Sequence, residues 1–402
     1  MKIVVQKFGG TSVATPEARA AVRKKIIEAV SNGFSPIVVV SAMGRSGDAY
    51  ATDSLIDVIK NEYRSVSARN LDTIMCCGEL ISAAVMAASL ESEGLQAVAL
   101  TGGQAGIWTD DNFGAADIID IDVKVLKSYL AKAIIPVVCG FQGRTEDGIF
   151  TTLGRGGSDT TAAALGAALQ AEAVEIYTDV DGIMTADPRV VSKANILDCV
   201  SYADVCQMAH QGAKVIHPRA VEIAMKKEIP IIVKSTFSDA PGTLICTEEA
   251  VSRTSNHLTR IISGVAYLKD LAQFKVQLDS KIPQLGKHLY DELAKNKISV
   301  GCLNLQPELS MFSVFMFDCE KTHALLTNDG FDFEVHNDCA KVSIVGSGMR
   351  GVHGIMATFV AALTENGITI LQMVDSDTTI SAIVHQEQLN NAVTALHDAF
   401  GL

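Results

Sequence analysis

The sequence lacks the features that mark membrane, secreted and nucleic-acid-binding proteins. No apolar run approaches the roughly 18 residues of a membrane helix, and the opening MKIVVQKFGG is too short and polar-ended for a secretory signal. The 33 Lys and Arg residues against 46 Asp and Glu give a net charge of −13, which repels nucleic acid and anionic membranes. The sequence therefore predicts a cytoplasmic protein that binds neither nucleic acid nor a membrane.

Histidine and paired cysteines are missing where much acid–base and metal chemistry needs them. All nine histidines lie at His210 or later, so a reaction that requires an imidazole base finds none in the first half of the chain. The nine cysteines include no C-x-x-C pair, and Cys76 and Cys77 are adjacent in an apolar, helix-like segment. This pattern suits neither a disulfide framework nor a zinc site, and it predicts buried, reduced thiols and no protein-built metal site.

What is present is enough apolar sequence for two or three packed domains, since the chain has 402 residues of which 48% are hydrophobic. Up to residue 235, short β-rich runs alternate with helical patterns; the runs are IVVQKF, PIVVVSA, QAVALTG, IIPVVCG, VEIYTDV and IPIIVKS. This alternation predicts an α/β domain with a largely parallel sheet that is buried on both faces. Ligands of such sheets bind beyond the carboxyl ends of the strands.

The remainder of the chain contains an internal repeat. LAKNKISV, which starts at Leu293, matches LTENGITI, which starts at Leu363, and the same offset aligns Gln284 with Gly354. Because two separate sites share the offset, chance similarity is the weaker explanation, and we expect two β-α-β-β units forming paired ferredoxin-like modules. The polar segment between the halves sets the predicted limits: a catalytic domain over 1–237, a linker over 238–262, and modules over 263–335 and 336–402.

The stretch VVQKFGGTS places Lys7 at the end of the first predicted strand, followed by Gly9 and Gly10. A cation beside glycine amides predicts a phosphate cradle, and Thr15-Pro16-Glu17 marks the start of the next helix. The alternative is a lysine at a strand end beside an ordinary turn. No G-x-x-x-x-G-K-[ST] motif occurs, so the cradle is not a P-loop.

Residues 151–169, TTLGRGGSDTTAAALGAAL, place Arg155 in a glycine run before an alanine-rich helix. Glycines allow a ligand close to the backbone, and Ser158 or Asp159 is expected to cap the helix. An anionic ligand is therefore predicted at this helix start. Asp159 stands where a dinucleotide fingerprint needs its last glycine, so that motif is excluded.

The stretch EIYTDVDGIMTADPR is a predicted strand followed by Thr178, Asp179 and, further on, Arg189. A carboxylate at a strand end can accept hydrogen bonds from ribose hydroxyls, and an arginine can bind phosphate. The alternative is ordinary Asp-Gly and Asp-Pro turn chemistry.

Taken in order, these segments resemble the aspartate kinases of the amino-acid kinase family. The motifs are KFGGTS near the start, SAMG at 41–44, GE at 78–79, LGRGGSDTTA from 153, TDVDGIMTADPR from 178 and GAKVIHPRAVE from 212. The repeated C-terminal part resembles the tandem ACT modules through which such kinases are regulated. The resemblance implies an α/β amino-acid kinase fold, with a largely parallel sheet sandwiched by helices, plus two ferredoxin-like ACT modules.

The resemblance also implies the reaction, in which MgATP phosphorylates the β-carboxylate of L-aspartate to give 4-phospho-L-aspartate and ADP. This step leads to lysine or diaminopimelate, threonine and methionine, and it uses ATP and Mg²⁺. A carboxylate nucleophile is already ionised at neutral pH and needs no general base, which agrees with the scarcity of histidine. The reaction needs charge neutralisation and alignment of two anions instead.

The family pattern assigns roles residue by residue. Lys7 and Asp159 are the catalytic residues. The residues expected to face aspartate are Ser41, Thr52, Glu79, Arg155, Gly156 and Ser158. The residues expected to bind ATP are Lys7, Gly9, Gly10, Thr178, Asp179, Met184, Arg189 and Lys214.

Within this assignment, Arg155 pairs two-pronged with one carboxylate of aspartate and Glu79 takes the ammonium group. Glu79 has an alternative role as the cap of a following helix, and Asp159 as an N-cap only. Many relatives carry tyrosine where Met184 stands, so a phenol hydrogen bond to the nucleotide is absent here.

Two other functions compete with this one. The first is a different amino-acid kinase, acting on glutamate, N-acetylglutamate, carbamate or a nucleoside monophosphate, and the Arg155–Glu79 pair and the C-terminal repeat disfavour it. The second is a non-catalytic amino-acid sensor of the same fold, which the presence of Lys7 and Asp159 disfavours.

Regulation is predicted from the two ACT loops. Gln284 stands where the first loop should have glycine, while the second loop keeps Gly348, Gly351 and Gly354, so only the second is expected to have the backbone freedom for close approach to a ligand. The segment MVDSDTTIS at 373–381 looks like the diaminopimelate-sensitive type. We therefore expect a homodimer or higher homo-oligomer built partly through these modules, with meso-diaminopimelate or a similar pathway amino acid such as lysine as effector, rather than lysine and threonine together.

Overall fold

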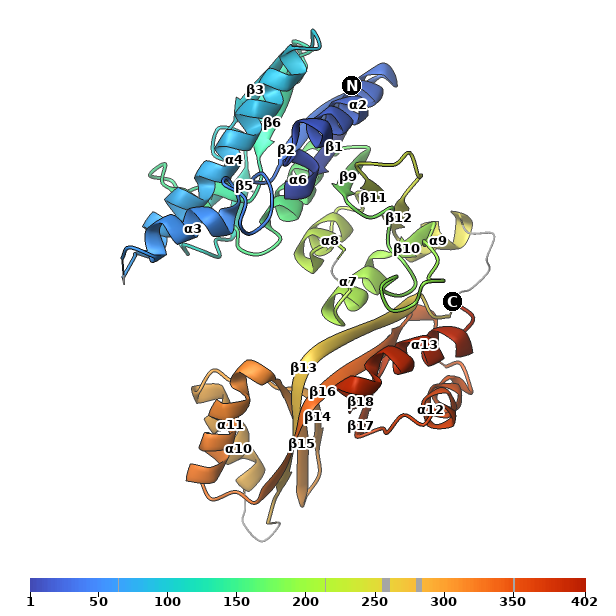
Figure 1. Cartoon of the computed structure of the whole chain (residues 1–402). Coiled ribbons are helices and arrows are strands. Elements are labelled where there is room, and N and C mark those ends of the chain that lie inside the picture. Colours follow the sequence, from blue (N-terminus) through green and yellow to red (C-terminus); the bar gives the residue numbers. More distant parts are fainter. Residues whose placement is uncertain (64, 214, 255–260, 280–283, 350) are drawn as a thin grey trace. The chain divides into compact units, whose positions relative to one another are not determined.

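The computed structural model describes residues 1–63, 65–213, 215–254, 261–279, 284–349 and 351–402. The chain forms two compact units, which are described separately (Figure 1). The first comprises Met1–Ile183, Ile196–Cys206 and Lys214–Asn256, and the second comprises Met184–Asn195, Gln207–Ala213 and His257–Leu402. Two short segments that precede the predicted linker therefore belong to the second unit, so the units do not follow linear domain limits.

The first unit is built on an eight-stranded sheet with the strand order β10-β12-β11-β9-β1-β2-β6-β3. β11 and β12 pair antiparallel, and the other neighbours in this sheet pair parallel. The largely parallel sheet predicted from the sequence is confirmed. Its strands are β1 (Lys2–Phe8), β2 (Phe34–Val40), β3 (Ala97–Leu100), β6 (Ile135–Cys139), β9 (Ala173–Thr178), β10 (Cys199–Ser201), β11 (Ile231–Ser235) and β12 (Thr243–Cys246).

Helices α2 and α4 pack on this sheet through a shared apolar core that includes Phe8, Val38 and Met86. The predicted start of α2 is confirmed, because the Thr15 side chain accepts a hydrogen bond from the backbone N of Ala18 at 3.2 Å. A smaller sheet has the order β5-β4-β7-β8, with strands Ile118–Ile121, Ile107–Thr109, Gln142–Arg144 and Phe150–Thr152. The helices up to the linker are α1 (Gly10–Val13), α2 (Pro16–Ser31), α3 (Thr52–Lys60), α4 (Ala68–Glu91), α5 (Lys124–Leu130), α6 (Gly157–Leu169), α7 (Tyr202–His210), α8 (Pro218–Met225) and α9 (Glu248–Thr254).

Helix α4 corrects one expectation, because it is long and apolar enough to cross a membrane by length and composition alone. Its many alanines raise the hydropathy of a segment that also carries charged groups. Two of these, Asp72 and Glu79, are buried and accept hydrogen bonds from backbone amides elsewhere in the first unit. These contacts identify α4 as a core helix of this unit.

The second unit is built on a six-stranded sheet with the order β14-β15-β13-β16-β18-β17. The two longest strands, β13 and β16, pair antiparallel and run through both modules: β15 pairs with the end of β13, and β18 with the end of β16. In Figure 1, α10 and α11 cover one end of this sheet, and α12 and α13 cover the other. The elements are β13 (Gly264–Gln277), α10 (Leu285–Lys295), β14 (Gly301–Leu305), β15 (Leu309–Phe315), α11 (Met316–Asn328), β16 (Phe333–Val345), α12 (Ile355–Glu365), β17 (Gln372–Asp375), β18 (Thr379–His385) and α13 (Leu389–Ala399).

The internal repeat is visible in the backbone. Both ends of α10 and α12 differ by 70 positions, from 285 to 355 and from 295 to 365. The residues before these helices, Gln284 and Gly354, are both left-handed, with φ of 67° and 91°. Gln284 adopts this conformation despite its Cβ, and the close approach of a ligand to the second loop alone stays a prediction.

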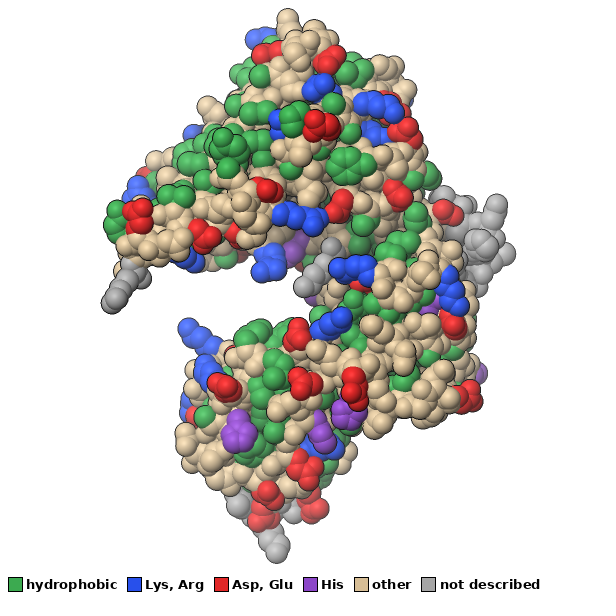
Figure 2. All heavy atoms as spheres, in the orientation of Figure 1, with side chains coloured by type: hydrophobic (Ala, Val, Ile, Leu, Met, Phe, Trp, Pro, Cys, Tyr) green, Lys and Arg blue, Asp and Glu red, His purple; other side chains and the backbone are tan. Residues whose placement is uncertain are grey.

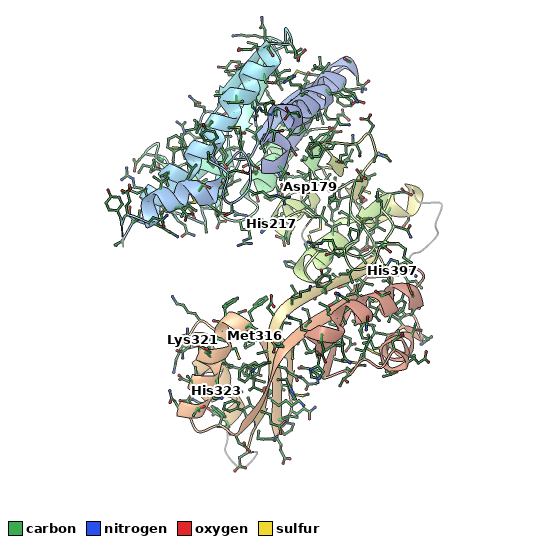
Figure 3. The ribbon with its side chains drawn as sticks, viewed as in Figure 1. Asp179, His217, Met316, Lys321, His323 and His397 are labelled. Carbon is green, nitrogen blue, oxygen red and sulfur yellow. The ribbon has the colours of Figure 1, made fainter. Side chains whose placement is uncertain are left out.

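The segment Met184–Asn195 is part of the core of the second unit, although it precedes the predicted linker. Val191 packs in the same apolar cluster as Phe359 of α12. The backbone N of Val265 in β13 donates to the carbonyl of Thr185 at 2.7 Å, and the Thr185 hydroxyl lies 2.9 Å from the imidazole Nε2 of His397 on α13. Figure 3 labels His397 on this helix.

Candidate active site

A pocket of about 290 Å³ lies at the carboxyl ends of β1 and β2 and at the start of α6. Parallel strands end at the same edge of a sheet, so side chains that follow different strands meet there. The pocket brings together most of the residues predicted to face aspartate and the transferred phosphate. It is lined by Lys7, Gly10, Ser41, Ala42, Gly44, Thr52, Glu79, Phe141, Gly154, Arg155, Gly156, Gly157, Ser158 and Asp159.

The two predicted catalytic residues form an ion pair in this pocket. The Lys7 ammonium at the end of β1 lies 2.6 Å from the Asp159 carboxylate, and the side chains are only 12% and 13% exposed. The expected N-cap role of Ser158 or Asp159 is wrong, because α6 begins at Gly157 after a left-handed Gly156. Asp159 therefore lies in the first turn, and its carboxylate also accepts from the backbone N of His217 at 3.4 Å.

The turn over residues 7–10, which we call the phosphate turn, is closely packed against the loop after β2. A Cβ on Gly10 would lie 2.6 Å from the carbonyl oxygen of Gly44 and 2.8 Å from that of Ala42, so only glycine fits. Gly9 is close to Lys7, since a Cβ there would lie 3.6 Å from the Lys7 Nζ. The backbone of the turn thus folds around the lysine.

Glu79 is buried in the wall of the pocket, with a relative exposure of 2%. One carboxylate oxygen accepts from the backbone N of Ala42 at 3.0 Å, and the other has no hydrogen-bond partner among the described residues. Burial raises the pKa of Glu79 to about 8. The residue lies inside α4 and caps no helix, so its free oxygen is suited to an incoming cation such as an ammonium group.

Asp72 supports the site from beneath the pocket lining, and no role was predicted for it. It lies seven positions before Glu79, two turns earlier on the same face of α4, and is fully buried. Its carboxylate accepts from the backbone N and the hydroxyl of Thr152, both at 2.8 Å, and from the backbone N of Gly114 at 3.0 Å. It therefore ties the strand before the glycine run to the helix that carries Glu79.

Arg155 is exposed and lies in the lining of the pocket between two left-handed glycines, Gly154 and Gly156, whose φ values are 73° and 70°. The structure gives Arg155 no ion pair with another described residue. Ser41 and Ser158 lie beside it in the lining, and their hydroxyls are 3.0 Å apart. The guanidinium is therefore available to an anion that enters the pocket.

His217 brings an imidazole from the second half of the chain to the glycine turn, and no role was predicted for it. A Cβ on Gly156 would lie 2.2 Å from Cγ of the His217 ring, so the ring packs directly on the glycine turn (Figure 3). Its Nδ1 accepts from the backbone N of Arg219 at 3.3 Å, and burial lowers the pKa of His217 below its usual range. The imidazole that packs on the glycine turn is thus neutral at pH 7. The neighbouring Arg219 side chain donates to the carbonyl of Leu153 at 3.0 Å.

The residues predicted for ATP are only partly brought together. Thr178 and Asp179 follow β9, and the Thr178 hydroxyl donates to Asp179 at 3.1 Å. Asp179, labelled in Figure 3, forms an ion pair of 2.6 Å with Arg45, another residue that the sequence analysis missed. Lys214 lies outside the described residues.

Met184 and Arg189 belong to the second unit. Arg189 binds both carboxylate oxygens of Asp187, and the Tyr267 hydroxyl of β13 donates to the same carboxylate at 2.8 Å. The Arg189 guanidinium lowers the pKa of Asp187 to about 2. Met184 packs against the apolar core of this unit.

Among the described residues, no group of three or more His, Cys, Asp or Glu side chains could hold a metal ion. All nine cysteines are free. Mg²⁺ is usually bound through one or two carboxylates together with substrate phosphates and water. Asp159, beside the phosphate turn, fits a metal that arrives with the nucleotide.

Comparison with known proteins agrees with this geometry. Residues 2–235 match the Amino acid kinase family, and residues 334–398 match an ACT domain. The chain is 46% identical to Aspartokinase 1 of Bacillus subtilis over 402 residues, covering 100% of both chains, and 40% identical to Aspartokinase of Geobacillus stearothermophilus, covering 100% of this chain and 98% of that one. The structure is similar to E. coli aspartokinase III in complex with aspartate and ADP, with a TM-score of 0.77, 26% identity and 100% coverage of both chains. The chain therefore belongs to the aspartokinases of the amino acid kinase family.

Proposed function

We propose that the protein transfers the γ-phosphoryl group of ATP to the β-carboxylate of L-aspartate, giving 4-phospho-L-aspartate and ADP. The observation that carries this proposal is the composition of one pocket. It holds a buried carboxylate with a free oxygen, Glu79, a free guanidinium, Arg155, and the Lys7–Asp159 ion pair. These groups match the ammonium group, one carboxylate and the developing phosphate charge of the reaction.

On the aspartate side, the Arg155 fork would bind the α-carboxylate through two parallel hydrogen bonds. Glu79 would take the ammonium group through the oxygen that lacks a partner. The hydroxyls of Ser41 and Ser158, with Thr52 at the start of α3, would bind the remaining polar atoms. Aspartate is then held at two of its three charged groups, and its β-carboxylate is left to attack.

On the phosphate side, Lys7 would neutralise the charge that develops on the transferred phosphoryl group. Asp159 holds the ammonium at 2.6 Å and fixes its position before ATP arrives. Mg²⁺, when bound with ATP, would further neutralise the phosphate charge. The carboxylate nucleophile carries no proton at neutral pH, so the neutral imidazole of His217 is not needed as a base.

A hydroxamate assay of acyl phosphate formation tests the proposal directly. We expect product with ATP and L-aspartate and background signal with glutamate, N-acetylglutamate and carbamate. The Lys7→Met variant is the negative control for chemistry. Product only with another acceptor would identify a different amino-acid kinase, and no product with any acceptor would favour a sensor without catalysis.

We further propose inhibition by meso-diaminopimelate or a similar single amino acid acting on the ACT modules, with a coupling of about 1 to 3 kcal/mol. The second loop supports this proposal, because Gly351 and Gly354 are both left-handed, with φ of 76° and 91°. Initial rates with diaminopimelate, lysine, threonine and methionine, singly and in pairs, test this. Inhibition only by lysine and threonine together would contradict the choice of effector.

A homodimer through the second unit is also proposed. Four of its apolar side chains near β14 and β15 are 38% to 80% exposed, and these are Leu303, Leu305, Phe315 and Phe317. Sedimentation of the wild type and of Phe317→Glu measures the oligomer, and an unchanged dimer in this variant would exclude Phe317 from the interface.

The surface charge supports a cytoplasmic enzyme of amino-acid biosynthesis with no nucleic-acid or membrane partner. The net charge is −13. Among the described residues on the face drawn in Figure 2, Lys and Arg are interspersed with Asp and Glu.

A further inference from the structure

We propose that Arg45 is a phosphate-binding residue of the nucleotide site. When ATP binds, Arg45 breaks its ion pair with Asp179 and binds the phosphate chain. This inference rests on the proposed function, in which the phosphates lie at the phosphate turn. Neither the family motifs nor the predicted site residues include Arg45, which follows the SAMG segment.

The topology of the sheet places the Arg45–Asp179 ion pair across the phosphate turn. β1 lies between β2 and β9, and Phe8 is in register with Val40 on one side and Tyr177 on the other. Arg45 follows β2 and Asp179 follows β9, and their side chains meet at 2.6 Å. The pair therefore bridges the two strands that flank the carboxyl end of β1, where the phosphate turn lies.

The backbone that carries Arg45 is held against the phosphate turn. The backbone N of Gly44 donates to the carbonyl of Gly10 at 3.0 Å. The backbone N of Arg45 donates to the Asp48 carboxylate at 2.8 Å, and Gly44 takes a left-handed φ of 90° that suits glycine. Release of Asp179 therefore requires movement of a side chain and not of the loop.

The present partner of Arg45 is one that a phosphate can replace. The Arg45 and Asp179 side chains are 70% and 45% exposed, and an exposed ion pair contributes little to stability. A guanidinium bound to phosphate makes two charge-assisted hydrogen bonds, which are stronger. Once Arg45 binds the phosphates its charge neutralises part of theirs, which limits their repulsion of the released Asp179, and the Asp179 carboxylate is free to accept from nucleotide hydroxyls.

The test is a calorimetric titration of Arg45→Gln with ADP and with adenosine, together with steady-state kinetics. We expect the affinity for ADP and the kcat/KM for ATP to fall by about tenfold or more, the scale of one charge-assisted contact. Affinity for adenosine and the KM for aspartate should not change, and Arg45→Lys should lose less than Arg45→Gln. Lys24→Gln is the matched control, because Lys24 forms a similarly exposed pair with Asp239, with exposures of 67% and 72%, and lies within helix α2 and not at the carboxyl end of a strand.

Two results would overturn the inference. Unchanged ADP affinity in Arg45→Gln would show that the Arg45–Asp179 pair is only a surface ion pair. Tighter ADP binding in this variant would show that the pair hinders nucleotide binding. Lys7→Met in the same titration separates this failure from that of the proposed function. Normal ADP affinity in Lys7→Met would show that the phosphates do not bind at the phosphate turn. Reduced ADP affinity in Lys7→Met together with normal ADP affinity in Arg45→Gln would reject the Arg45 inference alone.

Discussion

The aspartate side and the nucleotide side of the site are held in different ways. On the aspartate side Glu79 is 2% exposed, and the adjoining Lys7–Asp159 pair, which would face the transferred phosphoryl group, is 12% and 13% exposed. On the nucleotide side Asp179 is 45% exposed and pairs with Arg45, which is 70% exposed. Buried groups keep their geometry without a ligand, while exposed pairs can exchange partners when a ligand arrives. We therefore expect the buried part of the pocket, around Glu79, Lys7 and Asp159, to be preformed and to give the larger effects on substitution.

The largest effect is expected for Lys7→Met. Removing the ammonium should lower kcat by a factor on the order of 10³, because its charge is needed most in the transition state. Aspartate binding should change little, since Lys7 does not pair with that substrate. Steady-state kinetics with calorimetry of aspartate check both halves, and a variant with near-normal kcat would remove Lys7 from the mechanism.

The next largest effect is expected for Arg155→Lys. A point charge cannot reproduce a two-pronged pair with a carboxylate, so aspartate binding should weaken by about 2 to 3 kcal/mol. Titration with aspartate and with ADP measures the two sides separately. Loss of ADP affinity with unchanged aspartate affinity would move Arg155 to the nucleotide side.

The pH dependence of aspartate binding should report Glu79. Burial raises the pKa of Glu79 to about 8, so below that pH the free enzyme carries the neutral acid. An ammonium ligand needs the carboxylate, so the affinity for aspartate should rise by up to about tenfold per pH unit between pH 6 and 8, and level off above pH 8. In Glu79→Gln the affinity should be low and this slope should vanish, and a slope that survives would assign the titration to another group.

The smallest effect is expected for Arg189→Gln, which should raise the KM for ATP only a few-fold. Arg189 is already bound by both oxygens of Asp187. The cost of breaking this pair offsets much of the binding free energy that a contact between Arg189 and phosphate would contribute. Lys193→Gln, which breaks another exposed pair of the second unit, is the matched control. A loss of activity in Arg189→Gln as large as that in Lys7→Met would show that the exposure of a side chain does not predict the effect of its substitution on activity.

The parts of the site predicted from sequence are those set by local chemistry. A strand end followed by glycines identified Lys7, because the carboxyl ends of parallel strands share one edge of a sheet, and a glycine run before a helix start identified Arg155. The helix start at Ser158 or Asp159 was wrong because the left-handed Gly156 takes the cap position. The left-handed backbone of Gln284 was not predicted either, because a side chain other than glycine rarely adopts it.

The parts not predicted depend on contacts between distant positions. Asp72 meets Thr152 and Arg45 meets Asp179 only after the sheet has formed. For Asp72 a signal was present in its spacing of seven residues from Glu79 on one helix face. Neither Arg45 nor His217 had such a signal, because their roles come from the order of strands and the packing of a ring on a turn.

The most direct test of a preformed aspartate side is calorimetric titration of the nucleotide-free enzyme with aspartate at pH 7, in two buffers of different ionisation enthalpy. Aspartate should bind without nucleotide. With a Glu79 pKa of about 8, the difference in binding enthalpy between the buffers should correspond to release of close to one proton per site. This proton release must disappear in Glu79→Gln. No binding until a nucleotide is added, or binding with no proton released, would contradict the account.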